Sequence, residues 1–411
     1  MIQLRDYQLE IRDKASEVLM NKGFVYLAME VRTGKTLTSL AIAKKIKSKS
    51  VLFITKKKAI SSIEGDFDKF GADFYIHVIN YESLHKVSTQ IKFDTIIIDE
   101  AHSISAFPKP SKRAKDVRML IIKNKAKVIL LSGTPTPESY SQMYHQVYGI
   151  PKNPFSEYSN FYKFSRKYVR VKQRFINGII VNDYSEGLET IMDDMKPHMM
   201  AFSQKEAGFK VDTKEQVLEV EMNKTTYELA ERLKKHLVIE GKEEVVLADT
   251  PVKLMMKLHQ IYSGTVKFES GNSEVLDYSK AEFIRKQFKN VKVGIFYKFK
   301  AELEALKCVY GDALTTELTE FENTDKSIAL QIVSGREGIS LRQAKALVYY
   351  NIDFSATSYW QSRDRMTTKD RLENDVYWIF SRGGIEKKIY KAVTNKKDYT
   401  LSHFKKDLLS L

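Results

Sequence analysis

In FVYLAMEVRTGKT, residues 24–36, an apolar run is followed, after four residues, by a glycine, a lysine and a threonine. The run Phe24–Met29 is unbroken rather than alternating, which is typical of a strand buried on both faces of a parallel sheet. A helical pattern follows from Lys35 to Lys47. Glycine lets a backbone approach phosphate closely, and a helix N-terminus directs N–H groups at it. The stretch therefore predicts a strand, a phosphate-binding loop and a helix.

Lys35 and Thr36 give this loop its chemistry. In a phosphate loop the lysine reaches the β- and γ-phosphates of a nucleotide, and the threonine hydroxyl ligates magnesium. Met29 stands where the usual motif has its first glycine, and a helix N-terminus with a solvated lysine is the competing interpretation. The residues that would contact the nucleotide here are Arg32, Thr33, Gly34, Lys35 and Thr36.

Short apolar runs recur through the first 150 residues, with helical segments between them. They are Val51–Thr55, Tyr75–Ile79, Thr95–Asp99 and Val128–Leu131. This alternation predicts a doubly wound α/β domain over 1–150. The same alternation of apolar runs and helical segments returns in residues 276–411. Its candidate strands are Val293–Tyr297, Ile328–Ser334, Ala346–Asn351 and Val376–Phe380. We interpret the intervening segment, 151–275, as a helical insertion with helices over 223–240 and 251–262.

Two polar motifs follow strands of the first domain. Asp99-Glu100-Ala101-His102 comes after one apolar run, and Ser132-Gly133-Thr134-Pro135 comes after another. Because open α/β sheets bind ligands at the carboxyl ends of their strands, we expect both motifs beside the phosphate loop. Asp99 would hold magnesium, and Glu100 would orient or deprotonate an attacking water. An acidic helix N-cap and an ordinary turn are the alternative interpretations of the two motifs.

Charge and composition narrow the class of protein. The 411 residues include 67 Lys and Arg against 52 Asp and Glu, a net charge of +15. This excess favours a polyanionic partner, although a basic protein can also simply be soluble. The single cysteine, Cys308, excludes an intramolecular disulfide framework. No apolar run approaches the roughly eighteen residues of a membrane span, and the N-terminus lacks a signal core, so we expect a cytoplasmic protein without a membrane partner.

Residues 151–180 combine basic and aromatic side chains. Phe161, Tyr162, Phe164 and Tyr168 interleave with Lys163, Arg166, Lys167 and Arg170. The aromatic side chains could stack on bases while the cations neutralise phosphates, or they could form a core beneath a basic outer face. Residues 171–181 predict two strands around Asn177-Gly178, a type I′ hairpin turn. We expect this hairpin to contact a DNA duplex through Lys172 and Arg174.

In this order, the motifs resemble those of superfamily-two helicases, and most closely those of the Swi/Snf-type double-stranded-DNA translocases. The first half carries Leu4–Gln8, Gly34-Lys35-Thr36, Asp99-Glu100-Ala101-His102 and Ser132-Gly133-Thr134-Pro135. The second half carries Met256–Ile261, Ile295-Phe296-Tyr297, the fifth-motif stretch Ser334–Leu341 and the sixth-motif stretch Gln361–Arg365. The resemblance spans most of the chain.

The resemblance implies two RecA-like motor domains of parallel sheet, joined by the helical insertion and its hairpin. ATP and Mg²⁺ would bind between the motors, and hydrolysis would drive movement along DNA, mainly double-stranded, with forked or single-stranded DNA as further substrates. The role would lie in replication, recombination or repair. An RNA helicase and an ATP-binding scaffold with little turnover are the alternatives. The short chain is similar to phage-encoded members that act in the bacterial cytoplasm, and we expect a monomer.

The resemblance also implies roles for single residues. Gln8 would contact adenine, Gln361 and Arg365 would be catalytic with Arg365 as an arginine finger, and His102 and Gly338 would lie at the nucleotide. The predicted nucleic-acid track consists of Thr55, Lys56, Asn80, Tyr81, Thr134 and Ser334. Two positions depart from the family's pattern. Thr368 replaces a second arginine, so that either Arg371 substitutes for it or Arg365 acts alone, and Arg32 would contact either phosphate or Glu30.

Overall fold

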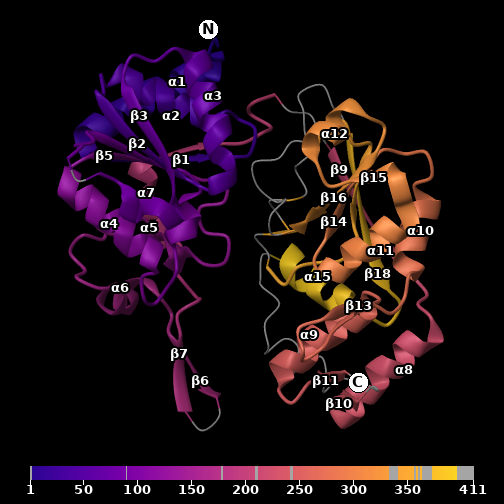
Figure 1. Cartoon of the computed structure of the whole chain (residues 1–411). Helices are drawn as coiled ribbons and strands as arrows, with labels where there is room; N and C mark the ends of the chain where they lie inside the picture. The colour runs from indigo at the N-terminus through magenta and orange to yellow at the C-terminus, as the bar shows by residue number, and fades with distance from the viewer. Residues whose placement is uncertain are drawn as a thin grey trace. The chain divides into compact units, whose positions relative to one another are not determined.

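The computed structural model describes residues 2–88, 90–176, 179–208, 212–240, 244–332, 341–355, 358–359, 362 and 373–395. The chain divides into two compact units, Met1–Phe209 and Lys210–Leu411 (Figure 1). Within the described residues, each unit is built on a six-stranded sheet whose neighbouring strands all run parallel. The predicted fold class, α/β with two parallel-sheet domains, is therefore confirmed.

The sheet of the first unit has the strand order β3-β2-β4-β5-β1-β8. Its strands are β1 (Phe24–Met29), β2 (Ser50–Thr55), β3 (Tyr75–Asn80), β4 (Thr95–Ile98), β5 (Lys127–Leu131) and β8 (Met199–Phe202). The central strands are almost wholly apolar because helices cover both of their faces. Phe24, Val25, Tyr26 and Leu27 on β1 are all completely buried.

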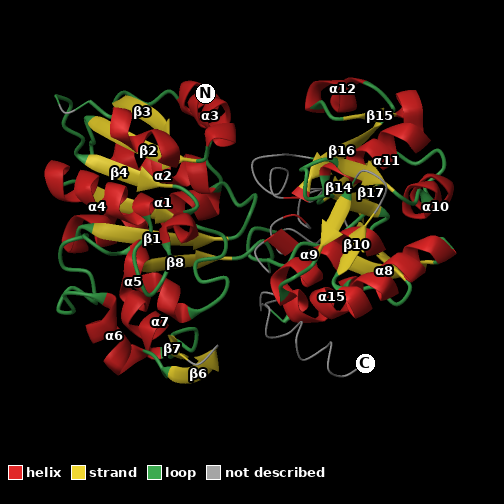
Figure 2. Ribbon diagram, turned by 60° about the horizontal axis from the view of Figure 1, so that its bottom comes forward, coloured by secondary structure: helices red, strands yellow, loops and turns green. Residues whose placement is uncertain are grey.

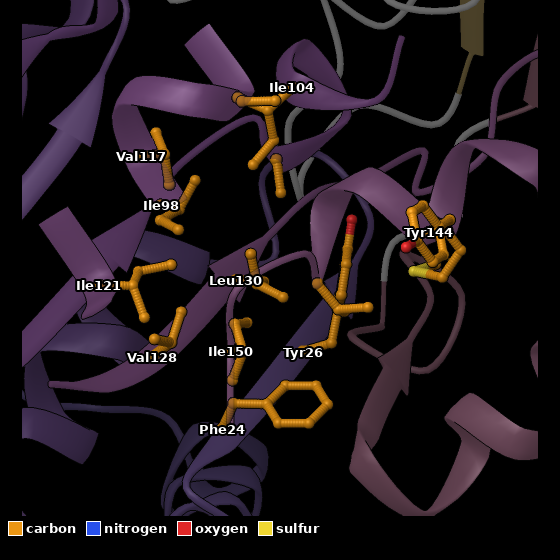
Figure 3. Close-up of a cluster of buried hydrophobic side chains, with 14 of the residues drawn as sticks. Phe24, Tyr26, Ile98, Ile104, Val117, Ile121, Val128, Leu130, Tyr144 and Ile150 are labelled. Carbon is orange, nitrogen blue, oxygen red and sulfur yellow. The ribbon is translucent and has the colours of Figure 1, made fainter. Parts of the chain in front are cut away.

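Alternate residues of each strand enter two different cores, as the two-residue period of a strand requires. Val25 and Leu27 pack with α1 (Asp6–Lys22), α2 (Lys35–Lys45) and α3 (Ile60–Phe70). Phe24 and Tyr26 pack on the other face with α4 (Lys112–Asn124) and α5 (Met143–Gln146). Figure 3 shows this second core, where Val117 and Ile121 of α4 lie near Ile98 and Val128.

A helix and a hairpin follow this sheet core in the first unit. They are α6 (Phe161–Tyr168), β6 (Lys172–Ile176) and β7 (Ile179–Asp183), after which α7 (Thr190–Met195) leads into β8. β6 and β7 pair antiparallel from Lys172↔Asp183 to Ile176↔Ile179, which confirms the predicted hairpin. Its turn, Asn177-Gly178, lies outside the described residues.

The aromatic residues of α6 form a core. Phe161, Phe164 and Tyr168 are buried, and Tyr158 and Tyr184 pack against them, whereas Tyr162 is exposed. Of the two interpretations of this segment, the structure therefore supports core aromatics beneath a basic outer face. The stacking of Phe161, Phe164 and Tyr168 on bases is wrong, because these rings are already covered by their own unit.

The sheet of the second unit has the order β15-β16-β14-β17-β18-β9. Its strands are β9 (Asp212–Val220), β14 (Val293–Tyr297), β15 (Leu314–Thr315), β16 (Ser327–Gln331), β17 (Ala346–Tyr349) and β18 (Glu373–Ser381). The helices around it are α8 (Lys224–His236), α9 (Pro251–Tyr262), α10 (Ser279–Gln287), α11 (Lys300–Tyr310), α12 (Leu318–Asn323) and α15 (Glu386–Thr394). Two small hairpins, β10–β11 (Val238–Glu240 and Val245–Leu247) and β12–β13 (Thr265–Lys267 and Ser273–Val275), complete the unit.

The structure divides the predicted insertion, 151–275, between the two units. β8 pairs with β1 and so completes the first sheet, whereas β9 pairs with β18 over nine residue pairs and completes the second. The segment therefore supplies an edge strand to each sheet, and the division falls at Phe209–Lys210. Within the described part of the chain, none of the helices combines the length and the apolar character needed to cross a membrane.

Candidate nucleotide site

The motif loops of the first unit leave its sheet at one edge. β1, β4 and β5 are neighbours or near neighbours in the parallel sheet, and their carboxyl ends lead into the phosphate loop, the acidic motif and the Ser132–Pro135 loop. The carboxyl edge is where open α/β sheets bind ligands. The three motifs separated in sequence are thus brought together by the strand order.

The first turn of α1 holds the phosphate loop. Gln8 is buried, and its Nε2 donates to the backbone oxygen of Gly34 at 3.2 Å and to Thr38 Oγ1 at 3.4 Å. The hydroxyl of Tyr7 donates to the carbonyl of Thr33 at 3.1 Å. Gly34 has φ 83°, a conformation that favours glycine, and a Cβ there would lie 2.3 Å from Gln8 Nε2 and displace that side chain. Gln8 therefore shapes the loop directly in this structure.

Lys35 begins α2 and reaches back over the loop. Its Nζ donates to the carbonyl oxygens of Met29 at 2.9 Å and of Glu30 at 3.1 Å. A Cβ built on Gly133 would lie 3.6 Å from the same Nζ, so the loop after β5 passes close to this lysine. A positive charge therefore stands at a helix N-terminus that already favours anions.

The phosphate loop is also held by residues at the end of β8, a support that the sequence did not reveal. Glu30 N donates to the Phe202 carbonyl at 2.9 Å, and Gln204 N donates to the Glu30 carboxylate at 2.7 Å. The rings of Tyr7 and Phe202 stack with centroids 4.6 Å apart. Glu30 is thus engaged with the β8 loop, and Arg32 has the positive φ of 62°. The only sequence signal for β8 is the short run Met199–Phe202, which carries no motif.

Asp99 is supported by residues of two neighbouring strand ends. Thr55 Oγ1 donates to Asp99 Oδ2 at 2.8 Å, and the hydroxyl of Tyr81 donates to the Asp99 carbonyl. Burial, and then the negative charge of Glu100, raise the pKa of Asp99 to about 7. A carboxylate held in this way would gain strongly from a cation beside it.

Glu100 and His102 link the acidic motif to the loop after β5. His102 Nδ1 lies 3.0 Å from Ser132 Oγ and 3.4 Å from Glu100 Oε2. Ser132 Oγ in turn accepts from Thr134 N at 3.1 Å. The buried Thr134 Oγ1 has no hydrogen-bond partner among the described residues. An unpaired buried hydroxyl at a ligand-binding edge fits a polar ligand that completes its bonding.

The residues predicted to lie on the nucleic-acid track take different positions. Thr55 and Tyr81 are buried, and their side chains are engaged at the acidic motif rather than at the surface. Asn80 is also buried and donates to Glu82 at 3.0 Å, whereas Lys56 is partly exposed. The side chains of Thr55 and Tyr81 support Asp99. Their contact with nucleic acid was expected from the resemblance to the family, which does not show whether a side chain turns inward.

Lys172 is exposed on β6, and its Nζ is 2.5 Å from the Glu186 carboxylate. Arg174 belongs to β6, and its side chain is outside the described residues. The predicted site residues Ser334, Gly338, Gln361 and Arg365 also lie outside the described residues, as do Thr368 and Arg371. Their roles stay predictions.

Comparison with known proteins agrees with this geometry. The model of the SNF2-related domain matches residues 50–267, more than half of the chain. The chain belongs to the SNF2-related family. A second model, that of the type III restriction enzyme res subunit, matches residues 1–73, which include the phosphate loop. Family membership confirms the resemblance to Swi/Snf-type superfamily-two helicases.

Individual relatives of this SNF2-related chain are longer proteins. It is 25% identical over 185 residues to the SWI/SNF-related matrix-associated actin-dependent regulator of chromatin subfamily A-like protein 1 of Xenopus tropicalis, covering 39% of this chain and 19% of that protein. The Bos taurus protein of the same name is 29% identical over 104 residues, covering 25% and 10%. The chain thus spans about a fifth or less of the curated relatives it matches. The Sulfolobus solfataricus SWI2/SNF2 ATPase core in complex with dsDNA has a TM-score of 0.43 and 16% identity, covering 98% of this chain and 92% of that chain.

Proposed function

We propose that this chain is an ATP-driven motor that moves along nucleic acid, with double-stranded DNA as its main track. The observation that carries the proposal is the meeting of three motifs at one sheet edge of the first unit. The loop before α2, the Asp99–Glu100 pair and the Ser132–Thr134 loop are joined there by hydrogen bonds and close backbone approach. This combination suits phosphoryl transfer, in which positioning and charge stabilisation dominate catalysis.

The side chains at this edge fit a magnesium nucleotide. Gly34 and the start of α2 would receive the phosphates, with Lys35 leaving its two carbonyl partners to reach them. Thr36 and Asp99 would hold Mg²⁺, which supplies charge neutralisation at the transferred phosphoryl group. Glu100 would then orient the attacking water or take its proton, and His102 would hold Glu100 and Ser132 in register. Gln8, already fixed at the loop, would add contact to the base.

The DNA track is supported by family membership and by charge. The net charge of +15 favours a polyanion, and contacts with phosphates carry no sequence information, so binding should be weakly sequence-specific and strongly salt-dependent. The Swi/Snf-type motifs favour the duplex over RNA. Gln361 and Arg365 of the sixth motif lie outside the described residues. In this proposal they would complete the catalytic site, with Arg365 as an arginine finger.

Steady-state ATP hydrolysis with Mg²⁺ tests this function. Rates are compared without nucleic acid and with blunt duplex DNA, single-stranded DNA and single-stranded RNA, and Lys35→Ala serves as the blank. We expect the duplex to stimulate hydrolysis most. Stimulation by RNA alone would replace the proposal by an RNA helicase. Hydrolysis that no nucleic acid raises above the blank would replace it by an ATP-binding scaffold.

The hairpin is expected to contribute charge to DNA binding. The double variant Lys172→Glu/Arg174→Glu should weaken binding to duplex DNA, and the slope of log Kd against log salt should fall by about 1–2 because up to two phosphate contacts are lost. Fluorescence anisotropy over a salt series measures both quantities. Lys14→Glu/Lys45→Glu is the matched control, because both lysines are exposed and ion-paired on the helical layer of the same unit. Equal slopes for wild type and the hairpin variant would contradict the contact.

A further inference from the structure

A small pocket in the first unit lies between α4 and the chain that follows α5. Its volume is about 350 Å³, at the lower end of the roughly 300–1,000 Å³ that is usual for ligand pockets. Figures 1 and 2 both show α5 next to α6, and the loop that joins these helices supplies most of the pocket wall. Among the described residues that line it, none belongs to the phosphate loop, the acidic motif or the Ser132–Pro135 loop. The pocket is therefore separate from the candidate nucleotide site.

Arg118 of α4 is the one charged residue within the described lining. Its guanidinium carbon lies 4.2 Å from the centre of the Tyr148 ring, which is a cation–π contact. Its Nε is buried and has no hydrogen-bond partner among the described residues, and no described carboxylate forms an ion pair with it. A buried N–H without an acceptor is costly, and the group it belongs to is a cation. Arg118 therefore indicates an anionic group that arrives with a ligand.

The rest of the wall is mainly aromatic. Tyr148 and Tyr158 are half-buried, so part of each side chain remains accessible to a ligand. Tyr144 and Phe155 line the pocket from buried positions, and Ser156 lines it from an exposed one. Aromatic side chains offer a surface on which a planar ring stacks. The pocket thus combines one cation with a surface that suits a ring.

The wall is held in place by contacts within the unit. The hydroxyl of Tyr144 donates to the Tyr158 carbonyl at 2.8 Å, which fixes the loop before α6 to α5. Gly149 has φ 92°, and a Cβ there would lie 2.3 Å from Arg118 Cγ, so the turn after α5 passes directly against the arginine. A pocket that is already formed avoids the cost of ordering its side chains when a ligand binds.

The elements around the pocket carry an excess of positive charge. Hydrogen bonds with the hydroxyls of Tyr168 and then Tyr158 raise the pKa of Lys167, which places this cation beside a residue of the pocket wall. Asp116 and Glu157 are the carboxylates of α4 and of the loop before α6. The other exposed cations outnumber them and are Lys112, Arg113, Lys115 and Lys123 on α4 and Lys163 and Arg166 on α6.

We propose that this pocket binds one unpaired nucleotide, with its phosphate on Arg118 and its base against Tyr148 and Tyr158. A guanidinium group presents paired N–H donors that match phosphate oxygens, and stacking on aromatic rings tolerates any base. The choice of a nucleotide over another anion that carries a ring rests on the proposed function. Its source is either a free nucleoside monophosphate or an unpaired residue of a DNA strand.

Photocrosslinking with 5-iodouracil, which couples to neighbouring aromatic side chains on irradiation, tests this proposal. The probes are 5-iodo-2′-deoxyuridine 5′-monophosphate, a single DNA strand with one 5-iodouracil, and the same strand in a blunt duplex. Mass spectrometry should find crosslinks at Tyr148 or Tyr158 with the free nucleotide or the single strand, and not with the duplex. A crosslink from the free nucleotide identifies that source, and one from the strand alone identifies DNA.

Two variants should each reduce the crosslink yield. Arg118→Gln removes the phosphate contact and should lower the yield about tenfold. Ser156→Glu, at an exposed position of the lining, should lower it similarly by placing a carboxylate in the pocket, and it leaves the buried core untouched. Lys123→Gln is the matched control, because it removes an exposed charge of α4 outside the lining and should crosslink as wild type does. Equal thermal unfolding midpoints for wild type and Ser156→Glu would assign the loss to the pocket.

The contrary outcomes are distinct from those of the proposed function. Crosslinks at neither tyrosine, crosslinks from the duplex alone, or wild-type yields from both pocket variants would overturn the nucleotide site. Phenylacetate that displaces the nucleotide probe more effectively than thymidine 5′-monophosphate would overturn it in favour of an aromatic, carboxylate-bearing segment of a protein. If duplex DNA stimulates ATP hydrolysis while the pocket fails to crosslink, the motor stands alone. If the pocket crosslinks while no nucleic acid stimulates hydrolysis, the site stands and the motor does not.

Discussion

Glu100→Gln should bind nucleotide as tightly as wild type and yet lose about 10²–10⁴-fold in DNA-stimulated ATP turnover. The factor is that expected for removal of a general base or of the group that orients the nucleophile. The amide keeps the shape of the side chain and can still bond to His102, whose Nδ1 lies 3.4 Å from the carboxylate. It cannot accept a proton from water. Phosphate release measures turnover, and a fluorescent ATP analogue measures binding.

Glu10→Gln is the control for this result. Glu10 is an exposed carboxylate of the same unit that pairs with Lys14 at the surface of α1, and its variant should turn over ATP at the wild-type rate. A Glu100→Gln protein as fast as wild type would remove Glu100 from its assigned role. Loss of nucleotide binding together with turnover would instead indicate that Glu100 maintains the shape of the loop.

Lys280→Met should destabilise the second unit by about 3–5 kcal/mol. Lys280 Nζ and Glu386 Oε1 are 2.7 Å apart, and both side chains are completely buried between α10 and the start of α15. Without the ammonium group, the hydrogen bonds that remain on the Glu386 carboxylate from described residues are those of Ser381. An uncompensated buried charge is far more costly than the loss of an exposed ion pair.

Urea unfolding followed by tryptophan fluorescence measures this effect. Both tryptophans, Trp360 and Trp378, belong to the second unit, so the signal reports on the unit that carries the change. Lys280→Met/Glu386→Gln should recover a large part of the lost free energy, because the charge left behind is removed while a partner for Ser381 remains. Lys224→Met, which breaks an exposed pair with Glu228 in the same unit, should cost at most about 1 kcal/mol. Equal costs for Lys280→Met and Lys224→Met would contradict the argument.

The sequence predicted those parts of the fold where one local pattern decides the structure. Unbroken apolar runs identified β1, β2, β4 and β14, because strands covered on both faces cannot tolerate polar residues. β9 was missed for the converse reason. Its sequence, DTKEQVLEV, begins with five consecutive polar residues at the edge of the sheet, and its only described strand partner lies more than 150 residues away. Neither the edge position of β9 nor its distant partner can be inferred from the residues of β9 and their near neighbours in the sequence.

The sequence predicted the motif residues of the site but not the residues that hold them in place. Lys35, Asp99, Glu100 and His102 meet at one edge because parallel strands bring their carboxyl ends together. Gln204 carries no chemical signature, and it is recruited to Glu30 only by the position of β8. Thr55 and Tyr81 show the same limit. The family pattern suggested contact with nucleic acid, whereas their side chains turn inward to Asp99, an orientation that tertiary packing decides.

The pairing of β9 with β18 also sets an order of events during synthesis of the chain. Asp212–Val220 emerges from the ribosome long before Glu373–Ser381, and each strand supplies the other's hydrogen bonds. The first unit has all of its described strands by Phe202, so it can fold while the rest is still being translated. The second unit cannot complete its sheet until β18 has been synthesised, and until then β9 at the N-terminal end of the unit lacks this partner. A nascent chain halted near residue 330 should therefore protect the first 200 residues from protease and leave β9 open to cleavage or to capture by a chaperone.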